Sequence, residues 1–212
     1  MSNVSLVWAT PDADKHIGYC ARVSNPANQD NPDVAGLLNY CAKNSHWSVF
    51  EMASACLEMN TTRDIARQLL RHRSFSFQEL SQRYSDVSVL GDFVTRECRV
   101  QDHKNRQNSF VTEDKELAAN WERMQQIVGN DAKRMYEKAL KWGIAKEQAR
   151  ALLPEGLTPS RVYVTGTLRS WITYCQVRTD ASTQKEHRLL ADEVLSILRV
   201  VAPTTMSAFF TL

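Results

Sequence analysis

The longest unbroken pattern in this sequence is helical, and it restricts the chain to folds that contain a long amphipathic helix. From about residue 113 to 142, apolar side chains recur at steps of three and four residues or at sums of those steps, which is the spacing of one helix face. We predict that this stripe packs inside the chain, although a seam of this length could also serve contact between subunits. Its members are Leu117, Trp121, Met124, Val128, Met135 and Trp142.

Shorter segments on both sides of this helix alternate between strand and helix patterns. With no repeat, low-complexity tract or linker between them, they predict one α+β domain over 1–212, with an antiparallel or mixed sheet flanked by helices. Runs rich in β-branched and aromatic residues predict strands at 4–9 and 160–166, and the alternation of MASACLEMN predicts a third strand at 52–60. The other predicted helices are 11–23, 31–44, 61–73, 145–153, 167–178 and 183–201, and 74–92 is predicted to be an ordered loop.

Two of these helices indicate which of their faces points to the core. The helix at 167–178 has one apolar face, and this leaves Arg169 and Thr173 together on another face and Arg178 at the end. The last helix, 183–201, has a similar apolar stripe. The predicted core residues are Leu168, Trp171, Ile172 and Cys175 on the first helix, and Leu190, Val194, Ile197 and Leu198 on the second.

A capping-box pattern marks the start of the helix predicted at 61–73. Thr61 and Asp64 are three residues apart, as in boxes where each side chain binds the other residue's backbone N–H. If this helix reaches about residue 73, Arg67 and Arg71 share one of its faces. The core stripe of the helix is then Ile65, Ala66, Leu69 and Leu70.

Composition and charge exclude several classes of protein. The chain has 212 residues, of which 43% are hydrophobic and 24% charged, and its net charge of +2 is too small for a general nucleic-acid or membrane coat. Its five cysteines are odd in number and widely spaced, which favours reduced thiols over a disulfide scaffold or zinc site. Because we find neither a signal peptide nor an apolar run of membrane-spanning length, we expect a soluble, cytoplasmic protein.

The segment RHRSFSFQELSQRYS, residues 71–85, concentrates cations around a single acid, Glu79. Between Lys43 and Lys104 there are seven arginines and no lysine, and the planar guanidinium suits a bidentate grip on phosphate or carboxylate. The seven glycines are isolated, so no glycine-rich phosphate loop can form. Any anion site must therefore be built from side chains.

A structural explanation of these cations must be weighed against a binding site. The arginines could form a solvated helix face, or could pair across a subunit interface with Glu58 or Glu79. However, three adjacent cations at 71–73 repel one another unless an anion is supplied. Phe75 and Phe77 could stack on a flat ring, although a core role suits them equally. No hydrolase motif or cysteine nucleophile is evident, so the residues indicate a nucleotide-like ligand without defining a reaction.

Several blocks, in the same order from about 46 to 190, resemble the flavin-dependent thymidylate synthases. The triplet at 71–73, followed by seven residues and Ser81, resembles the Arg-His-Arg-x7-Ser signature of that family, and Gln68 stands three residues before it. The other matching blocks are HWSVFE (46–51), ELSQRYS (79–85), ARALLP (149–154) and LRSWITYCQVR (168–178).

The resemblance implies a methyltransferase that converts dUMP to dTMP in nucleotide biosynthesis. Methylenetetrahydrofolate would give the carbon, and FAD reduced by NADPH would carry the hydride. It also implies a homotetramer whose active sites are shared between subunits, with dUMP and folate as ligands and neither nucleic acid nor membrane as a partner. Because all these ligands are anionic and flat-ringed, several arginines and few acids would suit the site.

The same resemblance implies a role for individual residues. Arg178 would be catalytic, because a fixed cation against the uracil favours the N3-deprotonated ring and makes C5 nucleophilic without an enzyme thiolate. No metal site is expected. The FAD-binding residues would be Ser48, Arg71, His72, Arg73, Glu79, Thr167, Arg169 and Thr173. The dUMP-binding residues would be Gln68, Arg71, Glu79, Ser81, Gln82, Arg83, Arg150 and Arg178.

Departures from the family pattern and a rival function keep this assignment a hypothesis. Alone, Arg178 could merely complement a helix C-terminus, and Arg150 could be a surface charge. The departures concern the geometry of the flavin site and the access of folate to it. They lie at Val49, Met52, Gln82, Thr167 and Thr173. The rival is a non-catalytic module that binds single-stranded nucleic acid through the same arginines and aromatics. Such a module would be colourless, whereas a flavoenzyme would be yellow or turn yellow with FAD.

Overall fold

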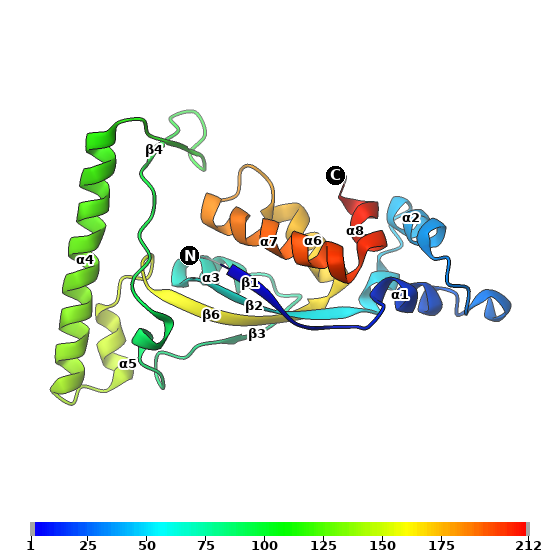
Figure 1. The fold of residues 1–212 in the computed structure, drawn as a ribbon, viewed down its shortest axis with the longest axis horizontal. Coiled ribbons are helices and arrows are strands. Elements are labelled where there is room, and N and C mark those ends of the chain that lie inside the picture. The colour runs from blue at the N-terminus through cyan, green and yellow to red at the C-terminus, as the bar shows by residue number, and fades with distance from the viewer. Residues whose placement is uncertain (1–2, 211–212) are drawn as a thin grey trace. The chain divides into compact units, whose positions relative to one another are not determined.

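The computed structural model describes residues 3–210, and these form two compact units of an α+β fold (Figure 1). Unit 1 comprises Asn60–Arg71 and Glu79–Val162. Unit 2 comprises Asn3–Met59, His72–Gln78 and the residues from 163 to 210. The predicted α+β class is confirmed, while the single domain over 1–212 stays a prediction.

A four-stranded sheet has the order β1-β2-β6-β3, and three of its strands contain residues of both units. The three predicted strands are present. The fourth, β3, was missed, because 74–92 was predicted to be a loop. This strand is only four residues long, and next to it the Leu80 N–H donates to the Arg161 carbonyl at 2.9 Å, a pairing that no local pattern reveals. The strands are β1 (Asn3–Ala9), β2 (Ser54–Thr62), β3 (Ser76–Glu79) and β6 (Pro159–Thr167).

Unit 2 contains most of the shorter helices, and α6 and α7 contact each other within it (Figure 1). The predicted core face of α6 is confirmed, since all four residues are fully buried. On α7 three of the four are fully buried, and Ile197 is half-buried. The elements are α1 (Ala13–Ala21), η1 (Pro26–Asn28), α2 (Ala35–Lys43), η2 (Trp47–Glu51), α6 (Leu168–Arg178), α7 (Lys185–Val201) and α8 (Pro203–Phe209).

The short helix α8 was not predicted. Pro203 begins it, a position that suits proline because the first N–H of a helix has no intrahelical partner. The Asp14 carboxylate, which is largely buried, accepts hydrogen bonds from the backbone N–H groups of Thr204 at 2.7 Å and Thr205 at 3.0 Å. It also accepts from the Thr205 hydroxyl at 2.6 Å. The cap therefore comes from a residue far away in the sequence.

In unit 1 the helix α3 (Arg63–Leu69) is shorter than predicted. Its N-cap residue is Thr62 rather than Thr61, and the Thr62 hydroxyl donates to Asp64 Oδ1 at 2.6 Å instead of capping a backbone N–H. Since the helix ends at Leu69, the predicted common face of Arg67 and Arg71 is wrong. The other elements of this unit are η3 (Val87–Leu90), β4 (Arg99–Gln101), β5 (Ser109–Val111), α4 (Lys115–Lys141), α5 (Lys146–Ala149) and η4 (Arg150–Leu152).

The long helix α4 is present, but the side chains predicted to pack inside the chain are exposed. Their exposed fractions run from 39% for Trp121 to 71% for Trp142. The buried residues of α4 are instead Gln125, Gly129 and Tyr136. Packing of the stripe within one chain was therefore wrong, and its use in subunit contact stays a prediction.

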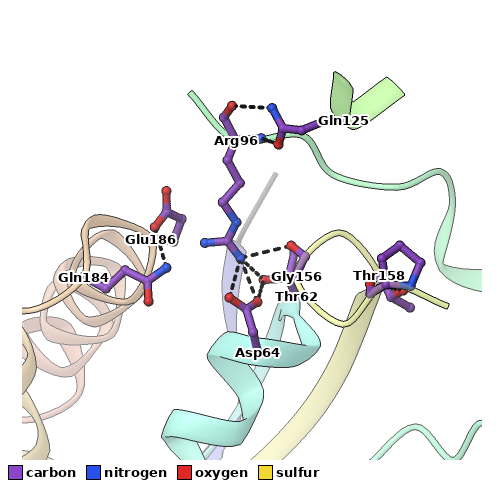
Figure 2. Close-up of polar contacts among 9 residues, drawn as sticks. Thr62, Asp64, Arg96, Gln125, Gly156, Thr158, Gln184 and Glu186 are labelled. Carbon is purple, nitrogen blue, oxygen red and sulfur yellow. Dashed lines mark hydrogen bonds and ion pairs between the residues drawn. The ribbon is translucent and has the colours of Figure 1, made fainter. Parts of the chain in front are cut away.

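Arg96 fastens the segment before β4 to the start of α3 (Figure 2). Its Nη2 donates to Thr62 Oγ1 at 2.6 Å, to both Asp64 oxygens at 2.7 and 2.9 Å, and to the Gly156 carbonyl at 3.2 Å. Its backbone exchanges two hydrogen bonds with the Gln125 side chain on α4. This network fixes the start of α3, the helix that carries two arginines of the site described next.

Candidate functional site

Unit 1 contains an open pocket of about 400 Å³ whose wall is rich in charge. Arginines approach it from the first turns of α3 and from η4. A small core of Tyr136 and Ala149, extended by Leu153, holds α5 against α4 and so positions Arg150. The lining residues are Arg63, Arg67, Gln82, Glu147, Arg150, Ala151, Leu153 and Glu155.

Two arginines at this pocket, Arg67 in its wall and Arg83 beside it, pair with exposed carboxylates. Arg67 Nε lies 2.8 Å from Glu155 Oε1, and this hydrogen bond raises the pKa of Arg67. Arg83 Nε lies 3.4 Å from Glu147 Oε2. Because pairs that are half exposed contribute at most about 1 kcal/mol, an incoming phosphate can compete with these carboxylates. Two predicted substrate residues, Gln82 and Arg150, thus line one pocket, and Arg83 pairs with a third wall residue.

Glu79 has partners that the sequence did not predict. Its Oε1 accepts a hydrogen bond from Arg63 Nη1 at 3.1 Å and another from Ser160 Oγ at 2.7 Å. The sequence patterns assign no role to Arg63. A signal was available, since Arg63 and Arg67 lie four residues apart on one face of α3.

The loop after β3 forms a tight turn around Ser81. The Ser81 carbonyl accepts hydrogen bonds from the backbone N–H groups of Tyr84 and Ser85 at 3.1 and 2.9 Å. Within this turn Gln82 is only 5% exposed, and among residues 3–210 its Nε2 has no hydrogen-bond partner. An unpaired buried donor costs about 1–3 kcal/mol, so the structure retains a polar group here at the expense of stability.

In unit 2 two predicted site residues touch each other. Arg178 Nε donates to His72 Nε2 at 2.9 Å, and Arg178 is the last residue of α6. The helix is anchored by the Leu168 N–H, which donates to the Ala53 carbonyl at 2.8 Å, and by the buried Trp171 indole, which donates to the Ala55 carbonyl at 3.1 Å. A rigid helix therefore presents the guanidinium.

The surroundings of Arg178 are apolar and hold their titratable groups uncharged. Burial raises the pKa of Tyr174, whose ring centroid lies 5.2 Å from that of His72. Burial, followed by the positive charge of Arg178, lowers the pKa of His187 to about 3. Burial, followed by the charge of Asp192, raises the pKa of Cys175 to about 12. Cys175 is therefore a thiol rather than a nucleophilic thiolate near neutral pH.

Three of the six residues predicted to bind FAD in unit 2 lie on α6 or at its N-cap. Arg169 Nη1 donates to Glu51 Oε1, a partner that the sequence did not reveal, and the Thr173 hydroxyl donates to the Arg169 carbonyl at 3.1 Å. Thr167 is the N-cap of α6, where its Oγ1 accepts from the Ser170 N–H. Ser48 is exposed in η2. Arg169 and Thr173 thus share a surface, as predicted.

The aromatic and basic residues after α3 differ in exposure. Phe75 is buried, with its ring centroid 4.5 Å from that of Trp171, and a side chain on Gly166 would collide with it. Its role is therefore in the core. Arg71 and Arg73 are exposed, and Gln68 is half-buried.

Residues 3–210 contain neither a candidate metal cluster nor a membrane-spanning helix. Within residues 3–210, no group of three or more His, Cys, Asp or Glu side chains could hold a metal ion. None of the helices in that range is both long and apolar enough to span a bilayer.

Comparisons with known proteins agree with the sequence blocks. The family model described as "Thymidylate synthase complementing protein" matches residues 5–204. A probable flavin-dependent thymidylate synthase of Paramecium bursaria Chlorella virus 1 is 46% identical over 204 residues, which cover 96% of this chain and 93% of that protein. The flavin-dependent thymidylate synthase of Synechocystis sp. is 48% identical over 192 residues, with 91% and 87% covered.

A solved structure with a similar fold belongs to an enzyme that acts on UMP and dUMP. The crystal structure of the UMP/dUMP methylase PolB from Streptomyces cacaoi, bound with 5-Br dUMP, superimposes with a TM-score of 0.85 and 28% identity. The match covers 99% of this chain and 94% of that chain. Since the family model and both relatives extend over most of the sequence, the predicted resemblance is confirmed, and this chain belongs to the family of flavin-dependent thymidylate synthases.

Proposed function

We propose that this chain methylates dUMP at C5 to give dTMP, with a bound flavin as its reducing cofactor. The observation that carries the proposal is the arginine-lined pocket of unit 1, because residues predicted from the family signature to hold dUMP form or flank it. The UMP/dUMP methylase that superimposes on this chain is bound to a halogenated dUMP, which supports a nucleotide as the ligand.

In this proposal the substrate is held by cations and hydrogen-bond donors rather than by a backbone phosphate loop. The guanidinium groups suit the phosphate, and Glu79 suits a ring N–H or a ribose hydroxyl. The proposed dUMP residues are Gln68, Arg71, Glu79, Ser81, Gln82, Arg83, Arg150 and Arg178.

Arg178 is the proposed catalytic residue. Its Nε is occupied by His72, while its other N–H groups donate to no residue among 3–210. One edge of the guanidinium is thus fixed, and the other can face the uracil. A cation held against the ring favours the N3-deprotonated form and increases electron density at C5, so the reaction needs no enzyme thiolate. The raised pKa of the buried Cys175 is consistent with such a mechanism.

The residues proposed to hold the flavin fit an anionic dinucleotide. Arg169 is half-exposed beside the Thr173 hydroxyl, and Ser48 offers another exposed hydroxyl, so this donor set suits a pyrophosphate. Reduced flavin supplies a hydride. Arg71, His72, Arg73, Glu79 and Thr167 complete the proposed FAD set.

Further details of the proposal follow from the family. The flavin is FAD, NADPH reduces it, and methylenetetrahydrofolate donates the carbon. The enzyme is a homotetramer with shared active sites, and the exposed apolar stripe of α4 supports its use in subunit contact. The five cysteines all lie within residues 3–210 and are free thiols there, which suits a reducing, cytoplasmic location.

Two measurements on the purified protein test the function. The visible absorption spectrum, recorded with and without added FAD, should show bound flavin. Incubation with dUMP, methylenetetrahydrofolate and NADPH should then yield dTMP, and omission of any one of them should stop it. A colourless protein that binds oligonucleotides and forms no dTMP would instead favour the nucleic-acid-binding module.

A further inference from the structure

Three residues from different segments of unit 1 meet at one carboxylate oxygen. Glu79 Oε1 accepts from Arg63 Nη1 at 3.1 Å and from Ser160 Oγ at 2.7 Å. The side chains of Arg63 and Glu79 are 11% and 18% exposed, and Ser160 is 2% exposed. Charged hydrogen bonds with so little solvent around them are stronger and better oriented than surface pairs.

Backbone hydrogen bonds hold Arg63 and Leu80, the residue after Glu79, against the start of β6, the strand that contains Ser160. The Arg63 N–H donates to the Thr158 carbonyl at 3.0 Å, and the Leu80 N–H donates to the Arg161 carbonyl at 2.9 Å. Ser160 lies between these two anchor points. The carboxylate of Glu79 is therefore oriented by the fold before any ligand binds.

The two oxygens of Glu79 are in different states. Oε1 carries both donors, whereas Oε2 accepts no hydrogen bond from any residue among 3–210. Arg63 meanwhile lines the pocket together with Arg67 and Arg150. The Arg63 guanidinium in the pocket wall thus offsets the negative charge of Glu79. This reduces the repulsion between Glu79 and an anionic ligand in the pocket.

We propose that Arg63 and Ser160 are positioning residues, which hold Glu79 by Oε1 so that Oε2 accepts a hydrogen bond from a ring N–H or hydroxyl of the nucleotide. The proposal rests on the proposed function, since it assumes that the pocket binds dUMP. The competing interpretation is that Arg63 leaves Glu79 and binds the phosphate itself. In the first interpretation Arg63 acts on the nucleotide through Glu79, whereas in the second it acts on the nucleotide directly.

A double-mutant cycle distinguishes these interpretations. The variants are Arg63→Met, Glu79→Gln and their combination, with kcat and KM for dUMP and the calorimetric Kd of dUMP measured on the flavin-loaded protein. Arg63→Met should lower kcat/KM about 30-fold in the natural background and less than about threefold in the Glu79→Gln background, because coupled residues are not additive. Equal losses in both backgrounds would overturn the proposal.

Conservative variants guard against misfolding of Arg63→Met. Arg63→Lys keeps a cation within reach of Glu79 and should recover at least about fivefold of the lost kcat/KM, whereas Ser160→Ala should cost about three- to tenfold. Arg134→Met is the matched control, since it breaks an exposed 2.9 Å pair with Asp131 outside the pocket and should change none of these three constants. Full activity in Ser160→Ala together with no recovery in Arg63→Lys would also contradict the proposal.

The cycle separates failure of this inference from failure of the proposed function. If the natural protein binds no dUMP and forms no dTMP, the function is wrong and the inference falls with it. If it binds dUMP and the losses are additive, the function stands and only the positioning role is wrong.

Discussion

The Arg178 guanidinium and the His72 imidazole are joined by a 2.9 Å hydrogen bond in which the imidazole accepts. An accepting Nε2 has no proton, so the pair requires the neutral ring, and a cationic His72 would both break the bond and repel Arg178. Two residues from separate sequence blocks therefore act together, and His72 orients Arg178, the proposed catalytic residue.

Replacing Arg178 should abolish turnover while leaving the flavin bound. Arg178→Ala removes a preorganised cation from the reacting ring, and losses of this kind are about 10²–10³-fold in kcat. The assay is dTMP formation, with flavin content read from the visible spectrum. Arg134→Ala, on the exposed face of α4, serves as the control. Near-normal turnover in Arg178→Ala would refute the catalytic role.

His187 should make the folded protein sensitive to acid. Burial and the positive charge of Arg178 lower its pKa to about 3, below the value near 6.5 of an unfolded chain. The unfolded state therefore binds the extra proton first, so stability is complete above about pH 6.5 and falls as the pH drops toward 3. When the pH is lowered from 7 to 4, the free energy of unfolding should fall in both proteins. The fall should be smaller in His187→Leu than in the natural protein, by up to about 3 kcal/mol. Urea denaturation at both pH values measures this, and parallel losses would contradict the expectation.

The buried thiols should resist alkylation. Burial raises the pKa of Cys175 to about 12 and also raises that of Cys41, so neither forms much thiolate near neutral pH. Cys20 and Cys98 are partly exposed. Treatment of the native protein with iodoacetamide, followed by mass spectrometry, should modify Cys20 and Cys98 and leave Cys175 unmodified. Rapid labelling of Cys175 in the folded protein would contradict the burial of its thiol.

The cap on α8 should contribute measurably to stability. Asp14→Ala removes three hydrogen bonds to a largely buried carboxylate and should lower the free energy of unfolding by about 2–3 kcal/mol. Asp14→Asn should cost less, because it keeps one acceptor. Urea denaturation gives the comparison, with the exposed Asp30→Ala as the control. An Asp14→Ala variant as stable as Asp30→Ala would contradict this explanation of α8.

The sequence predicted elements whose patterns are local. The strands at 4–9 and 160–166 follow from β-branched runs, the strand at 52–60 from alternation and the core face of α6 from helical spacing, and all were found. What it missed depends on partners distant in the chain. The strand β3 forms by pairing, α8 is capped from Asp14, and α3 stops at Leu69 before its apparent pattern ends.

For the site, too, the sequence revealed the residues that belong to local motifs and missed those defined by their partners. Signature blocks gave the residues that match a family, and the structure brings His72 to Arg178 and Gln82 to Arg150. Arg63 and Glu51 were missed, because their partners Glu79 and Arg169 are not evident from local sequence patterns. The stripe on α4 was misjudged for a related reason, since periodicity shows that a face is apolar but not what covers it.

Calorimetric titration of dUMP and of deoxyuridine, which lacks the phosphate, tests the central claim that the arginine pocket of unit 1 grips the nucleotide by its phosphate. Arg150→Met should weaken dUMP binding about 10–100-fold, the loss of one charge-assisted contact, and leave deoxyuridine binding unchanged. Unchanged dUMP affinity in Arg150→Met, or an equal loss for both ligands, would contradict the account.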